Sequence, residues 1–292
     1  MIYIERDGNL EELQYWIWFS KITNSKEKYK IFNEYKSPKK IYELSNAQIE
    51  NLEYGQAIKK ELKNSKYREN LKKEEQILKD KKIYLLTRNN KYYPQRLCNI
   101  YDAPISLYAK GNIEILNKKT LAMIGCRENS YYGKQVALTF SYQLSKKGIN
   151  IISGLAKGID SYSHIGAIKA KASTIAVIGS GLDNFYPKEN QWLYDEILKN
   201  NGCIISEYPL ETKPNKINFP ARNRIISGMS EGVIVVEAKR KSGTMITVDF
   251  ALEQGKEVFV VPGNITSKNS EGTNSLIQEG AKLVTNIEEI II

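Results

Sequence analysis

A nine-residue segment of this chain carries Lys216, Phe219, Arg222 and Arg224. Cationic side chains neutralise phosphate groups, and an exposed aromatic ring can stack on a nucleic-acid base for about 1–3 kcal/mol per base. The residue types and their close spacing therefore point to a phosphate-bearing ligand, with the ring available for a base.

The two arginines of this segment cannot act alike if it is helical. Successive helical residues are rotated by about 100°, so Arg222 and Arg224 point about 200° apart and share no face. One of them can contact a ligand while the other pairs with a carboxylate such as Glu207 or Glu237. In the alternative interpretation, Phe219 belongs to the core and both arginines form structural ion pairs. The segment alone leaves both interpretations open.

Four loops rich in glycine and small polar residues each follow a short apolar run that is typical of a strand. Glycine lets backbone N–H groups approach an anion, and a helix N-terminus carries partial positive charge. In one parallel sheet these loops would meet at the carboxyl edge and form a phosphate-binding rim. The loops are Gly125-Cys126-Arg127, the stretch from Ser153 to Asp160 with Gly154 and Lys157, Gly179-Ser180-Gly181, and the stretch from Glu237 to Thr244.

Common catalytic and cofactor motifs are missing. The first loop lacks a Gly-x-Gly-x-x-Gly fingerprint and a suitably placed acidic residue for a ribose, and the chain has no Gly-x-x-x-x-Gly-Lys-Ser/Thr P-loop. His164 is the only histidine, so no partners for a Ser/His/Asp triad or a multi-histidine metal site are found. Cys98, Cys126 and Cys203 are odd in number and widely spaced, which argues against a zinc site and a disulfide framework. We expect no catalytic residue, no metal and no cofactor.

Two polar residues near the second loop are expected to have structural roles. His164 should cap, or hydrogen-bond within, the helix that follows Gly158. Asp160 should lie at the N-terminus of that helix, where a negative charge is favourable, and should order the loop.

The elements that must position these residues change in character near residue 82. Residues 1–80 are predicted to form a small helical domain, with a stop at Ser37-Pro38 and a Lys/Glu-rich helix over 57–80. From residue 81 to residue 292, apolar runs alternate with helix-period segments, which indicates an α/β domain with a mostly parallel sheet and helices on both faces. The strands should begin near residues 83, 105, 121, 149, 174, 203, 233 and 258, and the main helices should span 131–147, 158–171, 190–200, 219–229 and 244–254.

The positive charge of the 292-residue chain is uneven. The net charge is +10, and residues 81–292 hold 27 Lys and Arg against 19 Asp and Glu, whereas residues 1–80 hold 16 against 14. A basic domain favours polyanions through counterion release, although lysines can also serve only to solvate a surface. The apolar runs are far shorter than the roughly 20 residues of a membrane span. Charged residues already occur within Met1–Asp7, before the apolar stretch that a signal peptide would need, so no signal peptide is expected. A cytoplasmic location without a membrane partner is expected.

The order and spacing of nine motifs, over roughly residues 82–284, resemble the DNA-processing protein A (DprA/Smf) family. Tyr93-Pro-Gln-Arg-Leu and Leu107-Tyr-Ala-Lys-Gly111 are similar to the lead-in of that family. The motifs are Ile124-Gly-Cys-Arg127, Ser153-Gly-Leu-Ala-Lys-Gly-Ile-Asp160, His164, Ser206-Glu-Tyr-Pro209, Phe219-Pro-Ala-Arg-Asn-Arg-Ile, Glu237-Ala, Ser242-Gly-Thr, Val261-Pro-Gly263 and Gly272-Thr-Asn-Ser-Leu-Ile-Gln-Glu-Gly-Ala281.

The resemblance implies an extended Rossmann-like fold that binds and protects incoming single-stranded DNA without cutting it. It also implies homodimers that load the RecA recombinase during natural transformation. By motif match, the strand-end arginine of the family falls on Arg127, its pocket lysine on Lys216 and its base-stacking phenylalanine on Phe219. The predicted DNA-binding residues are Arg127, Lys216, Phe219, Ser153, Gly154, Lys157, Arg222 and Arg224.

The sequence departs from the family pattern in three ways. Many members end in a winged-helix module, which is not expected before Ile292, so contacts from such a module are not expected either. The usual Gly-Ser-Arg of the first loop is Gly125-Cys126-Arg127, a change between small residues that should keep the pocket. The N-terminal helices are too divergent to assign to the helical module of the family.

Two alternative functions use a similar fold. Phosphoribohydrolases of the LOG type carry Pro-Gly-Gly-x-Gly-Thr-x-x-Glu, in which the glutamate assists glycosidic cleavage. Thr247 occupies that position here and cannot act as a carboxylate base. A sensor of a small nucleotide is the other alternative.

Overall fold

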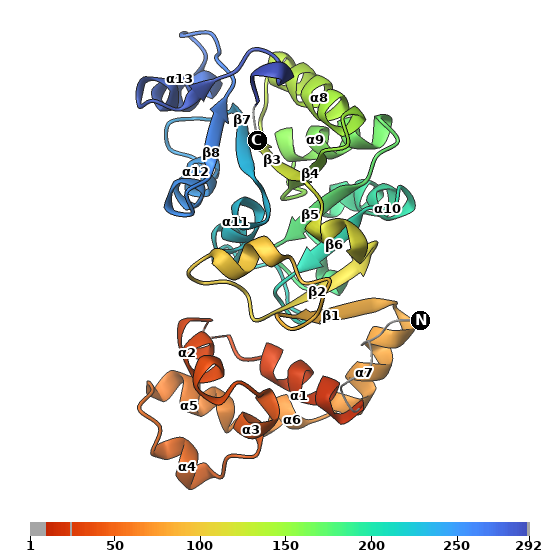
Figure 1. Cartoon of the computed structure of the whole chain (residues 1–292), viewed down its shortest axis with the longest axis vertical. Coiled ribbons are helices and arrows are strands. Elements are labelled where there is room, and N and C mark those ends of the chain that lie inside the picture. Colours follow the sequence, from red (N-terminus) through yellow and green to blue (C-terminus); the bar gives the residue numbers. More distant parts are fainter. Residues whose placement is uncertain (1–9, 24, 291–292) are drawn as a thin grey trace.

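The computed structural model describes residues 10–23 and 25–290. Within this part of the chain, helices run from residue 10 to residue 80 and the strands begin at residue 83 (Figure 1). The expected change from helical to α/β structure near residue 82 is confirmed. The expectations for Met1–Asp7 and for the outermost residues of the two predicted domains, 1–9 and 291–292, lie outside the described residues.

The N-terminal helices are short because polar residues interrupt them. Ser37 caps the third helix and Pro38 occupies its first turn, so the expected stop before this point is confirmed. The single helix predicted over 57–80 is wrong: Asn64 caps a new helix, and Asn70 adopts a left-handed φ of 58° that asparagine tolerates. The helices are α1 (Leu10–Ser20), α2 (Ser25–Tyr35), α3 (Pro38–Tyr42), α4 (Asn46–Glu50), α5 (Gln56–Leu62), α6 (Ser65–Arg68) and α7 (Leu71–Asp80).

The described strands form one nine-stranded sheet in the order β1-β2-β6-β5-β4-β3-β7-β8-β9. In this order, every neighbouring pair from β6 through β5, β4, β3, β7 and β8 to β9 is parallel. The pairs β1–β2 and β2–β6 are antiparallel. The mostly parallel sheet predicted from the apolar runs is confirmed. The strands are β1 (Ile83–Thr87), β2 (Ser106–Gly111), β3 (Thr120–Gly125), β4 (Asn150–Ser153), β5 (Thr174–Ile178), β6 (Cys203–Ser206), β7 (Gly232–Glu237), β8 (Glu257–Val260) and β9 (Lys282–Leu283).

Helices cover both faces of the parallel strands, as Figure 1 shows. Helices α11, α12 and α13 contribute to the core on one face, and α8 and α9 to the core on the other. The central strands are therefore buried on both sides, which explains why their sequences are apolar runs and not alternating patterns. The helices are α8 (Tyr131–Lys146), α9 (Ile159–Lys169), α10 (Gln191–Lys199), α11 (Asn218–Met229), α12 (Gly243–Glu253) and α13 (Glu271–Gln278).

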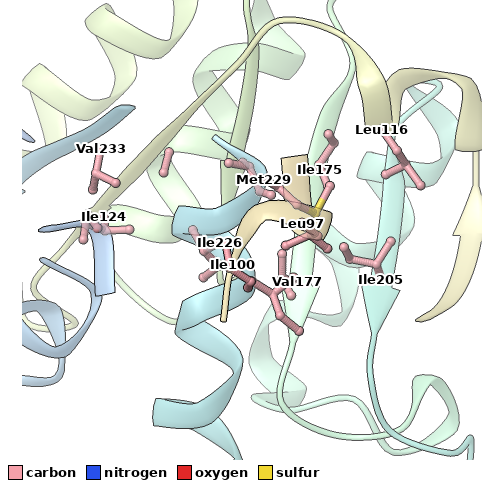
Figure 2. Packing of buried hydrophobic residues seen from close by; sticks show 14 of the residues in the cluster. Leu97, Ile100, Leu116, Ile124, Ile175, Val177, Ile205, Ile226, Met229 and Val233 are labelled. Atoms are coloured by element: carbon pink, nitrogen blue, oxygen red, sulfur yellow. The ribbon is translucent and has the colours of Figure 1, made fainter. Parts of the chain in front are cut away.

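Helix α11 is fixed to the sheet by its C-terminal half. Ile226 and Met229 are buried in the same core cluster as Val177 of β5 and Ile205 of β6 (Figure 2). This packing fixes the position of the N-terminal half of the helix, which carries Arg222, with respect to the carboxyl ends of the strands.

The N-terminal helices share a core with the outer strands of the sheet. One cluster of buried side chains includes Trp18 and Phe19 of α1, Tyr108 of β2 and Ile204 of β6. The Tyr108 hydroxyl also lies 2.7 Å from the Ser20 Oγ atom. Continuous apolar packing thus joins the helical region to the α/β region across residues 80–83.

The strand order reverses at β3. The chain runs from β3 through β4 and β5 to β6 on one side, and then returns to place β7 and β8 on the other side of β3. At such a reversal, the loops that leave two neighbouring strands turn in opposite directions and open a crevice at the carboxyl edge. The loops after β3 and β7 are two of the four in which the sequence predicts an anion site.

Candidate functional site

A cavity of about 790 Å³ lies at the carboxyl ends of β3 and β7. The loop after β3, the segment that leads into α11, and the start of α12 provide most of its wall. The lining includes Gly125, Arg127, Lys216, Phe219, Arg222 and Thr244.

Arg127 reaches the cavity from an exposed position after β3. The neighbouring carbonyl of Cys126 accepts a hydrogen bond of 3.1 Å from the Ile159 backbone N–H, which fixes the loop against the start of α9. Gly158 has a φ of 82°, and a Cβ atom there would lie 2.2 Å from the Cys126 carbonyl oxygen, so only glycine permits this approach. No ion pair within the described residues engages the Arg127 guanidinium, which leaves its charge available at the rim.

Phe219 and Lys216 lie together at the entry to α11. The Phe219 ring is half-buried, packs against Gly179, and still lines the cavity. Lys216 is exposed, and no ion pair in the described ranges involves its ammonium group. Phe219 is therefore a partly covered ring in the cavity wall and not a core residue. This excludes the alternative in which Phe219 belongs to the core.

Arg222 forms the floor of the cavity. Only 5% of the residue is exposed, and Nη1 donates a 2.7 Å hydrogen bond to the Gly154 carbonyl and a second one to the Val177 carbonyl. Burial lowers the pKa of Arg222 to about 10, with Asp160 opposing the effect, so the guanidinium stays charged at neutral pH. The side chain joins the ends of β4 and β5 and places a positive charge beneath the cavity.

Arg224 points away from the cavity, so its assignment to DNA contact is corrected. The residue is 3% exposed, and its guanidinium forms ion pairs of 2.8 Å with Asp102 and with Glu207. Burial alone would lower the pKa of Arg224, but Glu207 and Asp102 outweigh it and raise the pKa. The pairing predicted for one of the two arginines is thus found at Arg224, and Arg222 is the one that faces the ligand space.

The second loop contributes less to the cavity surface than expected. The Ser153 side chain is buried, and its hydroxyl donates a 2.7 Å hydrogen bond to the Met123 carbonyl, so the assignment of this hydroxyl to DNA is corrected. Gly154 is also buried and acts through its carbonyl, which holds Arg222. Lys157 is exposed but outside the cavity lining, and its ammonium lies 2.6 Å from Glu189.

Asp160 orders the second loop, as expected. Its carboxylate accepts a 3.1 Å hydrogen bond from the Gly154 backbone N–H, and the residue lies in the first turn of α9. His164 does not bond within α9, which corrects the prediction. Its Nδ1 atom lies 2.8 Å from the Thr174 hydroxyl on β5, and that hydroxyl donates to the Ile151 carbonyl. Burial lowers the pKa of His164 to about 3, so the imidazole is neutral and structural.

Several cavity residues were not among the predicted site residues. Tyr186 follows β5 and lines the cavity beside Phe219, with 5.8 Å between the ring centroids. An aromatic residue just downstream of the third glycine loop was the signal that could have identified it. Glu237 ends β7 outside the cavity lining and accepts hydrogen bonds from the Ser130 backbone N–H and hydroxyl, so it supports the start of α8. The carboxylate that does line the cavity close to Arg222 is that of Asp160.

The arrangement can hold an anionic, base-bearing ligand. Arg127 and Lys216 provide free cations at the rim, Arg222 provides a buried charge below, and Phe219 provides a ring. Thr247 lines the cavity where a glycosidase-type glutamate would be needed. Across residues 10–23 and 25–290, no group of three His, Cys, Asp or Glu side chains is arranged to hold a metal ion. None of the helices in these ranges is long and apolar enough to cross a bilayer.

Comparison with known proteins identifies the family. The family of DNA recombination-mediator protein A matches residues 84–292. DNA processing protein DprA of Bacillus subtilis is 49% identical over 203 residues, which are 69% of this chain and 68% of that protein. Protein Smf of Escherichia coli is 42% identical over 208 residues, and the match covers 71% of this chain but only 56% of that protein.

Solved structures agree with the sequence comparison. The X-ray structure of DprA from Streptococcus pneumoniae superposes with a TM-score of 0.79 at 36% identity and covers 94% of this chain and 96% of the other. Residues 84–292 alone cannot account for that coverage, so the similarity extends into the N-terminal helices.

DNA processing protein A from Helicobacter pylori, whose structure concerns its single-stranded DNA binding mode, superposes with a TM-score of 0.65 at 34% identity. The superposition covers 70% of this chain and 92% of the other. Together with the family match over the α/β region and the identities to the two curated relatives, this shows that the chain belongs to the DNA recombination-mediator protein A (DprA/Smf) family.

Proposed function

We propose that this chain binds single-stranded DNA, without sequence preference and without cutting it, in the cavity at the carboxyl ends of β3 and β7. The observation that carries the proposal is the meeting of Arg127, Lys216 and Phe219 around one cavity above the buried charge of Arg222. Every nucleotide has a phosphate and a base with a π-face, so this set of groups suits any sequence.

Each side chain has a distinct part in this proposal. Arg127 and Lys216 are exposed and can neutralise successive phosphates with release of counterions. Phe219 offers a ring whose backbone is fixed by α11, so a base can stack without first ordering the protein. Arg222 remains bonded to the second loop and acts through its charge and by holding the cavity in shape.

Membership of the recombination-mediator family supports a wider role. We propose that the chain acts in the cytosol as a homodimer, protects incoming single strands during natural transformation and loads the RecA recombinase on them. Residues 225–292 are proposed to provide the dimer surface. Light scattering at tens of micromolar protein tests the dimer, and co-sedimentation of RecA with protein-coated DNA tests the partner.

A titration of fluorescently labelled oligo-dT, followed by anisotropy at low and high salt, tests the DNA-binding proposal. We expect binding that weakens steeply as salt rises, because phosphate contacts dominate. Unlabelled oligo-dT should compete, whereas thymidine monophosphate at the same nucleotide concentration should not. Binding that does not depend on salt, or no binding at micromolar protein, contradicts the proposal. Competition by the mononucleotide alone would instead favour a nucleotide sensor.

A further inference from the structure

The segment after β5 presents Tyr186 to the same cavity that holds Phe219. The Tyr186 side chain lines this cavity, and 47% of the residue is exposed although its ring is large and mostly apolar. Its ring centroid lies 5.8 Å from that of Phe219, and the two ring planes are inclined by 53°.

The backbone around Tyr186 is held by its neighbours. Phe185 is buried and packs against the Tyr194 ring at 5.2 Å. A few residues further on, the Asn190 amide donates hydrogen bonds of 3.0 Å to the Leu155 carbonyl and 2.9 Å to the Ser161 hydroxyl. The Tyr186 ring therefore projects from an anchored segment, and ordering it on ligand binding requires little loss of backbone freedom.

The inclination of the rings determines how they can bind bases. One base held between two rings needs parallel planes about 7 Å apart, which is twice a contact distance of about 3.5 Å. Tyr186 and Phe219 are too close and too inclined for that arrangement. Two rings inclined in this way can each take a separate base but cannot hold one base between them.

We infer that Tyr186 is a second base-stacking surface that takes the nucleotide next to the one on Phe219. This inference rests on the proposed binding of single-stranded DNA.

Three variants of the full chain test the inference by oligo-dT anisotropy. Tyr186→Leu keeps an apolar contact to Phe219 but removes the ring, and should weaken binding by about 5- to 100-fold with an unchanged salt slope. Tyr186→Phe keeps the ring and should bind within about twofold of the unmodified protein. Tyr142→Leu is the matched control, because Tyr142 is 41% exposed on α8 but does not line the cavity, and should have no effect.

Photocrosslinking separates stacking from mere support of Phe219. An oligonucleotide that contains 5-iododeoxyuridine crosslinks to aromatic side chains on which its bases stack, and mass spectrometry of the peptides should find Tyr186 as well as Phe219. Weakened binding of Tyr186→Leu with crosslinks on Phe219 alone would overturn the inference, since Tyr186 would then only buttress the other ring.

The two levels of the proposal can fail separately. Unchanged binding by Tyr186→Leu, alongside clear losses in Phe219→Ala, overturns the second stacking surface and leaves the proposed function standing. Failure of the unmodified protein to bind oligo-dT overturns both.

Discussion

Replacing Arg127 by alanine should remove one phosphate contact without disturbing the fold. The side chain is exposed at the cavity rim, and no ion pair within the described part of the chain depends on it. Phe219→Ala is the informative comparison, because it removes a ring from the same cavity and no charge.

The expected magnitudes follow from counterion release. For single strands, each phosphate contact contributes about 0.7 to the slope of log K against log salt. Arg127→Ala should therefore reduce the slope by about 0.7. If the contribution of the contact vanishes at about 1 M salt, the same slope predicts binding weaker by about 15-fold at 0.02 M salt but only about 5-fold at 0.1 M. Phe219→Ala should weaken binding by about 5- to 100-fold at both salt concentrations, because stacking is not a charge contact.

Anisotropy titrations of labelled oligo-dT at four or more salt concentrations measure both quantities. Lys169→Ala is the matched control for charge, because Lys169 is exposed in the last turn of α9, at the end of the helix remote from the cavity. It removes the same charge from the chain and should leave the slope unchanged. Thermal unfolding of all three variants checks that each remains folded.

Equal slope changes for Arg127→Ala and Lys169→Ala would refute the reasoning, because the salt effect would then report the overall charge and not a local contact. A salt-dependent loss in Phe219→Ala would refute the division between ring and cation. A loss of thermal stability in Phe219→Ala with unchanged DNA affinity would show that the ring belongs to the core and does not stack on a base.

Three further outcomes concern the framework of the site. Gly154→Ala would place a Cβ atom 2.6 Å from the Arg222 guanidinium, so urea denaturation should show a destabilisation of about 1–3 kcal/mol. A destabilisation below about 0.5 kcal/mol would show that the loop moves to accommodate the methyl group. Arg224→Ala leaves Glu207 unpaired, and because that carboxylate is partly exposed we expect the free energy of unfolding to fall by about 3 kcal/mol. The salt slope of DNA binding should not change, and a changed slope would show that Arg224 contacts DNA. The pKa of His164 is about 3 in the folded chain and about 6.5 when the side chain is exposed, so between these pH values the unfolded chain binds more protons than the folded chain. The free energy of unfolding should therefore fall by about 1.4 kcal/mol per pH unit as the pH drops through this window. The stability curve of His164→Gln should lack this component, and parallel curves for the two proteins would contradict it.

Much of the α/β framework was predictable because its signals are local. The helix expected over 131–147 is found as Tyr131–Lys146, and that expected over 190–200 as Gln191–Lys199, because helix periodicity and capping residues act within a few positions. The failure at 57–80 is equally local: Asn64 and Asn70 break a segment whose Lys/Glu pattern resembles one helix.

Local signals in the sequence also predicted part of the cavity. Glycine loops after apolar runs predict an anion site at the carboxyl edge, since parallel strands bring their ends together whatever the details of packing. Arg127 directly follows β3, whereas Lys216 and Phe219 were predicted from the residue types of their segment and from the family resemblance.

The sequence by itself determined the kinds of groups available and the edge of the sheet at which they gather. Only the tertiary structure decided which arginine faces the cavity, because Asp102 and Glu207, distant in sequence, hold Arg224 away while two strand-end carbonyls hold Arg222 beneath it. A buried charge takes the orientation in which its hydrogen bonds and ionic partners are satisfied, and these partners exist only once remote segments have packed together.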